Sequence, residues 1–148
     1  MGMRCPEDFG VPDGDLIDLV VPNTLQDAKA PEERILADLA IHNYDEQSIF
    51  AIKLALEEAL TNAVKHGNGN DPARKLTVRY AVKPRHVVIA IRDEGPGFTP
   101  ELLPDPTADE NLELPNGRGI MLMFAYMTKI RFNDQGNEVW MLKSLDDD

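Results

Sequence analysis

EEALTNAVKHGN, residues 57–68, joins an apolar stripe to a row of polar side chains. Glu58, Asn62 and His66 are spaced four residues apart, so on a helix they project from one side. Such a row is often an ordinary solvated face. A carboxylate and an amide oxygen one turn apart also suit a hard cation such as Mg²⁺, or one can bind metal while the other accepts a proton.

The helix that carries this row is expected to run from Glu46 to about His66, with Asp45 as its N-cap. Lys65 and His66 either neighbour a bound phosphate or simply suit the helix C-terminus, where cations are favoured. Apolar side chains at helical spacing are expected to face the core: Ile49, Ile52, Leu56, Ala59, Leu60 and Ala63.

Two strands are expected after this helix, paired as an antiparallel hairpin. Apolar residues alternate with more polar ones over 76–82 and again over 87–91, as in half-buried strands. The tight connection Lys83-Pro84-Arg85 joins them. The second strand is expected to end at Asp93.

The motif DEGPGF, residues 93–98, places an acid where this buried strand stops. Gly95 and Gly97 permit a flat ligand to approach the backbone closely. The alternative is a tight turn in which Asp93 caps local amides.

The motif NGRG, residues 116–119, directly precedes an apolar segment that is expected to form a helix over 120–127. The free amides of Gly117 and Gly119, together with the positive end of that helix, would then face an anion. Arg118 adds a positive charge. Taken singly, this pattern is also typical of a glycine-rich helix entry.

The remaining elements complete an α+β fold, a two-layer sandwich whose mixed, mostly antiparallel sheet carries its helices on one face. A strand is expected over 15–21, a helix from Asn23 or Thr24 to about residue 43 that Pro31 restarts or kinks, and a final hairpin of 129–132 with 138–142. We interpret 1–14 as a disordered leader, 15–144 as one domain with a proline-rich loop at about 98–116, and 145–148 as an acidic tail.

Composition limits the classes of function. The net charge of -11 opposes the phosphate-neutralising surface that nucleic-acid binding requires, so direct nucleic-acid partners are not expected. The sequence has neither a membrane-spanning apolar run nor a signal core, and we expect a soluble cytoplasmic protein with no membrane contact. Its single cysteine, Cys5, cannot form an internal disulfide.

The three motifs together, in this order, resemble the ATPase superfamily of DNA gyrase, heat-shock chaperones, sensor histidine kinases and mismatch-repair proteins. EEALTNAVKHGN is similar to its asparagine-bearing helix, IRDEGPGF to its adenine-binding loop, and NGRGIMLM to its phosphate-binding turn. Within it, the chain most resembles the bacterial anti-sigma factor serine kinases, which share the E-A-x-T-N-A-x-x-H-G helix. The resemblance covers about 15–143 and implies a histidine kinase-like ATP-binding domain.

The resemblance implies roles for these residues with ATP and Mg²⁺ as cofactors. Glu58 is then the proton acceptor, Asn62 the Mg²⁺ ligand and Asp93 the acceptor for the adenine amino group. Residues 98–116 resemble an ATP lid, and Asn137 stands where the family often has a threonine near adenine. The other residues implied at the nucleotide are His66, Gly95, Gly97, Gly117, Arg118 and Gly119.

The function implied is a protein serine/threonine kinase that phosphorylates an anti-sigma factor antagonist with Mg-ATP, sequesters a sigma factor and forms a homodimer. Two alternatives remain open at this point. One is a nucleotide-gated binding module without catalysis. The other is an α+β interaction protein in which the glycine turns are purely structural.

Overall fold

The computed structural model describes residues 4–95, 123–133 and 135–145. Two short 3₁₀ turns come first, before the first strand. In chain order the elements are the 3₁₀ turns Glu7–Phe9 and Asp13–Asp15, β1 Ile17–Pro22, α1 Leu25–Ile41, α2 Glu46–Asn62, a π turn at Ala63–Gly67, β2 Lys75–Val82, β3 His86–Arg92, β4 Lys129–Phe132 and β5 Glu138–Ser144.

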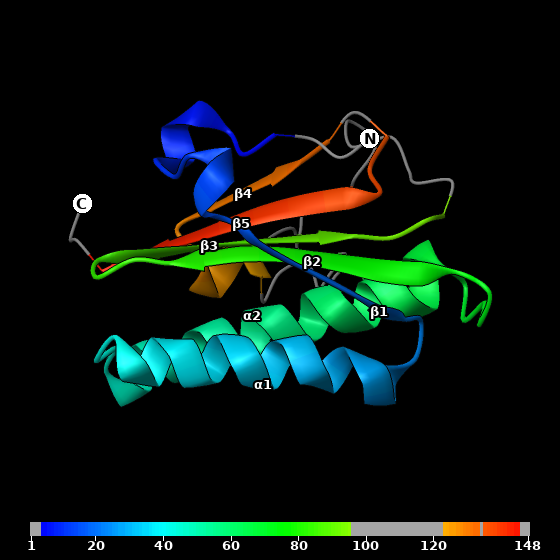
Figure 1. Ribbon diagram of the computed structural model, residues 1–148, viewed down its shortest axis with the longest axis horizontal. Coiled ribbons are helices and arrows are strands. Elements are labelled where there is room, and N and C mark those ends of the chain that lie inside the picture. The colour runs from blue at the N-terminus through cyan, green and yellow to red at the C-terminus, as the bar shows by residue number, and fades with distance from the viewer. Residues whose placement is uncertain (1–3, 96–122, 134, 146–148) are drawn as a thin grey trace, which may run out of the picture.

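The strands form one sheet in the order β1-β2-β3-β5-β4. Both expected hairpins, β2 with β3 and β4 with β5, are present, and β1 and β5 add to the outer edges of the first. Helices α1 and α2 lie side by side across one face of this sheet (Figure 1). The α+β prediction is therefore confirmed, and every strand pairing among the described residues is antiparallel rather than mixed.

Side-chain caps start both helices where the sequence indicates. Thr24, and not Asn23, caps α1, since its Oγ1 accepts a hydrogen bond from Asp27 N at 2.9 Å. Pro31 is buried inside α1 and neither ends nor restarts it. Asp45 caps α2 by accepting a hydrogen bond from Ser48 N.

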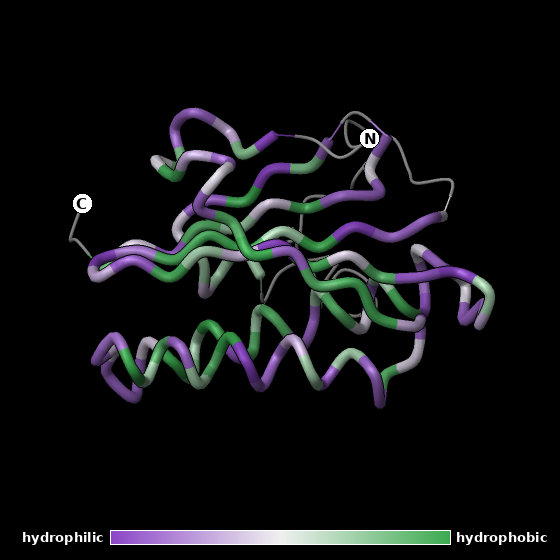
Figure 2. Tube along the Cα trace, viewed as in Figure 1, coloured by the Kyte–Doolittle hydropathy of each residue, from purple (hydrophilic) through white to green (hydrophobic). Residues whose placement is uncertain are grey.

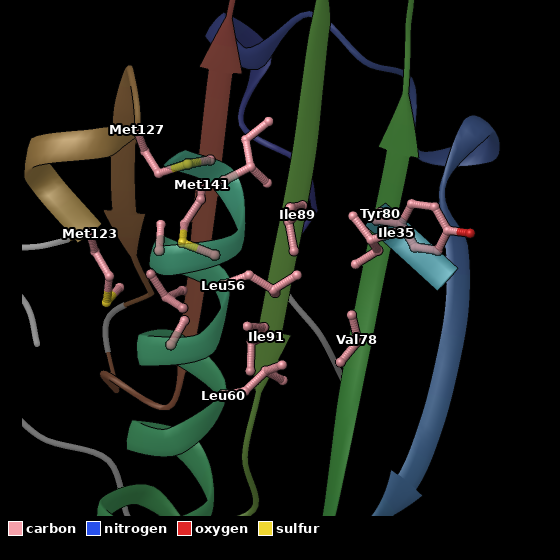
Figure 3. Packing of buried hydrophobic residues seen from close by; sticks show 14 of the residues in the cluster. Ile35, Leu56, Leu60, Val78, Tyr80, Ile89, Ile91, Met123, Met127 and Met141 are labelled. Carbon is pink, nitrogen blue, oxygen red and sulfur yellow. The ribbon is translucent and has the colours of Figure 1, made fainter. Parts of the chain in front are cut away.

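The main core lies between the two helices and the sheet. Helix residues such as Leu56 and Leu60 meet strand residues such as Ile89 and Ile91 (Figure 3). In the hydropathy view the central strands are largely apolar, whereas both helices alternate between apolar and polar residues (Figure 2). This pattern matches strands covered on both faces and helices covered on one.

The N-terminal segment, predicted as a disordered leader, packs on the face of the sheet opposite the helices. Phe9 and Val11 are buried there against Trp140, and the Asp8 carboxylate accepts two hydrogen bonds from Arg131, each of 2.9 Å. Figure 1 shows this N-terminal segment opposite the helices. The prediction failed because two apolar residues in a short Pro- and Gly-rich segment have no periodicity, and their apolar partner strands are distant in sequence.

Candidate functional site

The helix expected to continue to about His66 changes geometry one turn earlier. Helix α2 ends at Asn62, and the following π turn is closed by a 2.8 Å hydrogen bond from Asn68 N to Ala63 O. Glu58 and Asn62 keep helical spacing and are half-buried, whereas His66 lies in the wider turn and is exposed. Glu58 and Asn62 therefore share one side of α2, while the His66 imidazole does not continue their row. Isolated π turns within helices are frequent at functional sites.

Asp93 follows β3 directly and is buried, with 7% of its surface exposed. Its Oδ1 accepts a hydrogen bond from Gly95 N at 2.8 Å, and its own N–H donates to Asn137 O at 2.9 Å. Burial raises the pKa of the Asp93 carboxyl, against the opposing effects of the Gly95 hydrogen bond and of Arg74 and Arg92. A buried carboxylate of this kind is suited to accepting a hydrogen bond from a bound ligand.

Two glycines bring the π turn that follows α2 against the Asp93 loop. A side chain at Gly67 would overlap the Asp93 carboxylate, and one at Gly95 would overlap the Gly67 carbonyl. Neither position therefore accepts even a methyl group without movement. The residues present suit a nucleotide base, because this contact holds a buried hydrogen-bond acceptor, the Asp93 carboxylate, at the end of β3.

Side-chain amides of Asn68 and Asn23 hold this junction, the contact between the Asp93 loop and the π turn after α2. Asn68 Oδ1 accepts a hydrogen bond from Glu94 N at 2.8 Å, and Asn68 Nδ2 donates to Asn23 Oδ1 at 2.8 Å and to Lys75 O at 3.1 Å. Asn23 Nδ2 donates in turn to Asp71 O at 3.1 Å. The junction thus ties together α2, β2 and the loops after β1 and β3.

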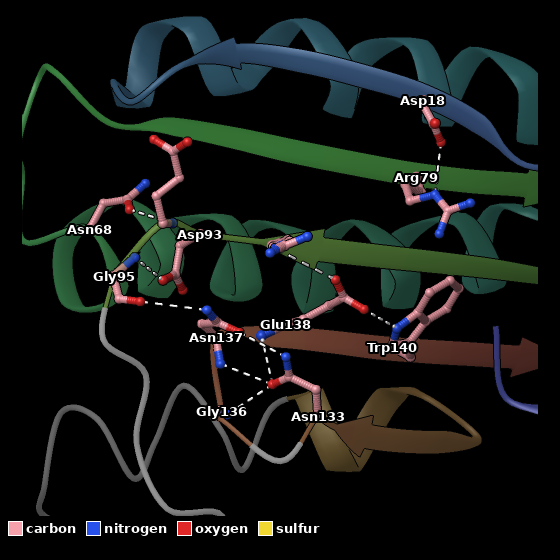
Figure 4. A network of polar contacts seen from close by, with 12 residues as sticks. Asp18, Asn68, Arg79, Asp93, Gly95, Asn133, Gly136, Asn137, Glu138 and Trp140 are labelled. Carbon is pink, nitrogen blue, oxygen red and sulfur yellow. Dashed lines mark hydrogen bonds and ion pairs between the residues drawn. The ribbon is translucent and has the colours of Figure 1, made fainter. Parts of the chain in front are cut away.

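The final hairpin contributes a second group of amides (Figure 4). Asn133 Oδ1 accepts hydrogen bonds from Gly136 N and Asn137 N, and Asn133 Nδ2 donates to Asn137 Oδ1 at 2.7 Å. Asn137 Nδ2 lies 3.5 Å from Gly95 O. Asn137, which replaces the threonine common in the family, is therefore buried beside the Asp93 loop and held by Asn133.

The sequence patterns gave no role at the site to the residues that hold this geometry, namely Asn23, Gly67, Asn68 and Asn133. The available signal was the turn-rich run after His66, which predicts a turn but not its partners. Asn23 and Asn68 are 45 positions apart, so only the tertiary structure pairs them.

Part of the predicted site lies outside the described residues: Gly97, Gly117, Arg118, Gly119 and the loop at 98–116. Within the described ranges, His, Cys, Asp and Glu side chains nowhere gather in threes around a possible metal position. In the same ranges, helices are too short or too polar to cross a bilayer.

Comparison with known proteins gives this geometry its context. Residues 21–143 match the family model described as the histidine kinase-like ATPase domain, and the chain belongs to this family.

Its curated relatives include serine kinases and anti-sigma factors. It is 32% identical to the serine-protein kinase RsbW of Bacillus subtilis over 70% of this chain and 68% of that protein. It is 30% identical to RsbW of Oceanobacillus iheyensis, over 60% of each chain, and 26% identical to the anti-sigma F factor of that organism, over 80% of this chain and 88% of that protein.

A solved structure agrees on the fold. The RsbU and RsbW domains of Rv1364c from Mycobacterium tuberculosis align with a TM-score of 0.56 and 17% identity, covering 87% of this chain and 31% of that one.

Proposed function

We propose that this protein is an anti-sigma serine/threonine kinase that binds Mg-ATP, phosphorylates an antagonist protein and sequesters a sigma factor. The observation that carries the proposal is the contact at Gly67 and Gly95 between the Asp93 loop and the π turn that follows α2. Membership of the histidine kinase-like ATPase domain family supports ATP use, and relatives named serine-protein kinase and anti-sigma F factor support the regulatory role.

Each side chain has a proposed task. Asp93 accepts a hydrogen bond from the adenine amino group, and the Gly95 backbone lies against the ring. Asn62 holds Mg²⁺ through its amide oxygen. Glu58, one helical turn earlier, accepts the proton of the attacking hydroxyl. His66 and, beyond the described residues, Gly97, Gly117, Arg118 and Gly119 complete the nucleotide contacts.

When bound, Mg-ATP supplies the transferable phosphoryl group and a cation that neutralises its charge. The chain itself contributes position and electrostatics. The half-buried Glu58 lies on the same side of α2 as Asn62, so one helix orients both the proton acceptor and the metal ligand. The phosphoryl acceptor is a Ser or Thr hydroxyl of the antagonist.

The assembly and location are proposed on the same grounds. We propose a homodimer in the cytoplasm, where a sigma factor and its antagonist protein would compete for it. The net charge of -11 supports protein partners over direct nucleic-acid contact.

Transfer of labelled γ-phosphate to a candidate antagonist protein tests the catalytic part. Glu58→Gln should lower the transfer rate at least ~100-fold while leaving ATP binding unchanged, because general-base catalysis contributes about 10²–10⁴-fold. Glu57→Gln, which alters the neighbouring carboxylate, is the matched control and should keep most of the activity. Equal transfer by wild type and Glu58→Gln would contradict the assignment.

A further inference from the structure

Asn68 is a buried side chain to which the proposed chemistry gives no task. Only 1% of its surface is exposed, and both ends of its amide are bonded. Oδ1 accepts from Glu94 N at 2.8 Å, while Nδ2 donates to Asn23 Oδ1 and to Lys75 O. A buried amide with partners on both sides is fixed in one orientation.

Asn68 supplies one of three acceptors that hold consecutive backbone amides of the Asp93 loop. Asp93 N donates to Asn137 O, Glu94 N donates to Asn68 Oδ1, and Gly95 N donates to Asp93 Oδ1. The first acceptor is a backbone carbonyl and the third belongs to the loop itself. The middle one belongs to a side chain from another element, so substitution can remove it without changing the loop sequence.

The backbone of Asn68 is fixed to the other half of the site. Asn68 N donates to Ala63 O at 2.8 Å, which closes the π turn directly after Asn62. Asn68 therefore links the helix that carries Glu58 and Asn62 to the loop that carries Asp93.

We propose that Asn68 is a positioning residue for recognition of the adenine amino group. By holding Glu94 N, it sets the angle at which Asp93 presents its carboxylate, and Asn23 supports it by fixing the orientation of the Asn68 amide. The inference rests on the proposed nucleotide site and adds a determinant of base specificity to it. Small errors in the placement of a hydrogen-bonding group weaken recognition sharply.

The test compares the affinities of ATP and of purine riboside triphosphate, which lacks the 6-amino group. Wild type should prefer ATP by roughly tenfold or more, since a hydrogen bond to a charged group is at stake. Asn68→Ala should reduce this preference to about threefold or less, chiefly by weakening ATP. Isothermal titration calorimetry gives both dissociation constants.

Two further variants separate positioning from general destabilisation. Asn23→Ala leaves Asn68 in place but removes a partner of its amide, so it should also lower the preference, and it decides the question if Asn68→Ala does not fold. Tyr44→Phe removes the hydrogen bond of Tyr44 Oη to Lys83 O, beyond the opposite end of β3, and should leave the preference unchanged.

The outcomes are distinct. If folded Asn68→Ala keeps the full preference for ATP over purine riboside triphosphate, the positioning role is overturned, even if both nucleotides bind more weakly. If Asn68→Ala does not fold, the same result in Asn23→Ala overturns it. Failure of wild type to bind ATP overturns the proposed function itself, and the inference with it.

Discussion

The two ends of the layer formed by α2 and β3 are built differently. Where α2 begins, Tyr44 is buried and donates its hydroxyl to Lys83 O at 2.7 Å, next to the fully buried Leu39. Where α2 ends, a π turn, Gly67 and buried asparagines surround Asp93. The first end is held by apolar packing, while the second contains a buried acid and glycines with no room for side chains. We infer that the first end serves stability and the second serves the site.

The largest expected effect is on stability, at the first end. Leu39→Ala should lower the free energy of unfolding by about 2–5 kcal/mol, because it leaves a cavity in a fully buried position. ATP affinity should stay unchanged in the folded protein, since distant sites act independently. Urea unfolding and calorimetry measure the two quantities.

Ile41→Ala, at a position 71% exposed on the same helix, is the control and should change stability by less than about 0.5 kcal/mol. A parallel loss of ATP affinity in Leu39→Ala would contradict the separation of the two ends.

Asp93→Asn should act in the opposite manner, on binding rather than on folding. Loss of the charged acceptor should lower the affinity for ATP by roughly 10–150-fold. Stability at neutral pH should hold or rise, because burial raises the pKa of this carboxyl and so disfavours its charged form in the folded protein. Asp18→Asn, on the exposed β1 edge, provides the matched control and should alter ATP affinity little. If Asp93→Asn were strongly destabilised but still bound ATP normally, Asp93 would serve stability rather than ATP binding.

Gly67→Ala tests the close contact at the second end. The added methyl group overlaps the Asp93 carboxylate, so a loss of about 1–3 kcal/mol in stability is expected, together with weaker ATP binding. Gly14→Ala should have neither effect, since no atom lies within 4 Å of the methyl position there. Thermal unfolding with and without ATP separates the two losses. Equal behaviour of the two alanine variants would remove the argument for a tight junction.

The smallest effect is expected between the ends, where α1 meets α2. Burial and a hydrogen bond with Glu57 raise the pKa of Glu32 from 4.5 to about 7, with Glu33 adding to the rise and Lys53 opposing it. A raised folded pKa gives stability that is complete below 4.5 and is lost as the pH rises through about 7. Glu32→Gln should flatten this dependence slightly, because solvent screening keeps it modest. Urea unfolding at pH 5 and pH 8 measures the change in the free energy of unfolding between the two pH values. The same change in wild type and Glu32→Gln would contradict the contribution of Glu32.

The sequence predicted those parts of the fold that depend on local pattern. Alternation over 76–82 and 87–91 located β2 and β3, and Asp45 located the start of α2. Prediction from the sequence failed for the segments whose structure depends on contacts between residues far apart in the chain. The N-terminal segment packs because Phe9 meets Trp140 at the far end of the chain, and Asn23 meets Asn68 only after the sheet has formed.

The candidate site was predictable to the same extent. The acid at a strand end and the polar pair on α2 came from spacing, and the structure brings their two segments into contact at Gly67 and Gly95. The π turn was not predictable, because the spacing of residues 58–66 fits a regular helix equally well and the contact of Gly67 with Asp93 joins segments far apart in sequence. The roles of Glu58, Asn62 and Asp93 stay predictions.

A calorimetric titration of ATP into wild type and Asn62→Ala, each with and without Mg²⁺, tests the proposed Mg-ATP site. Wild type should bind ATP more tightly with Mg²⁺, and Asn62→Ala should lose this metal dependence while remaining folded. Absence of ATP binding by wild type, or an unchanged dependence on Mg²⁺ in Asn62→Ala, would rule out the site as proposed.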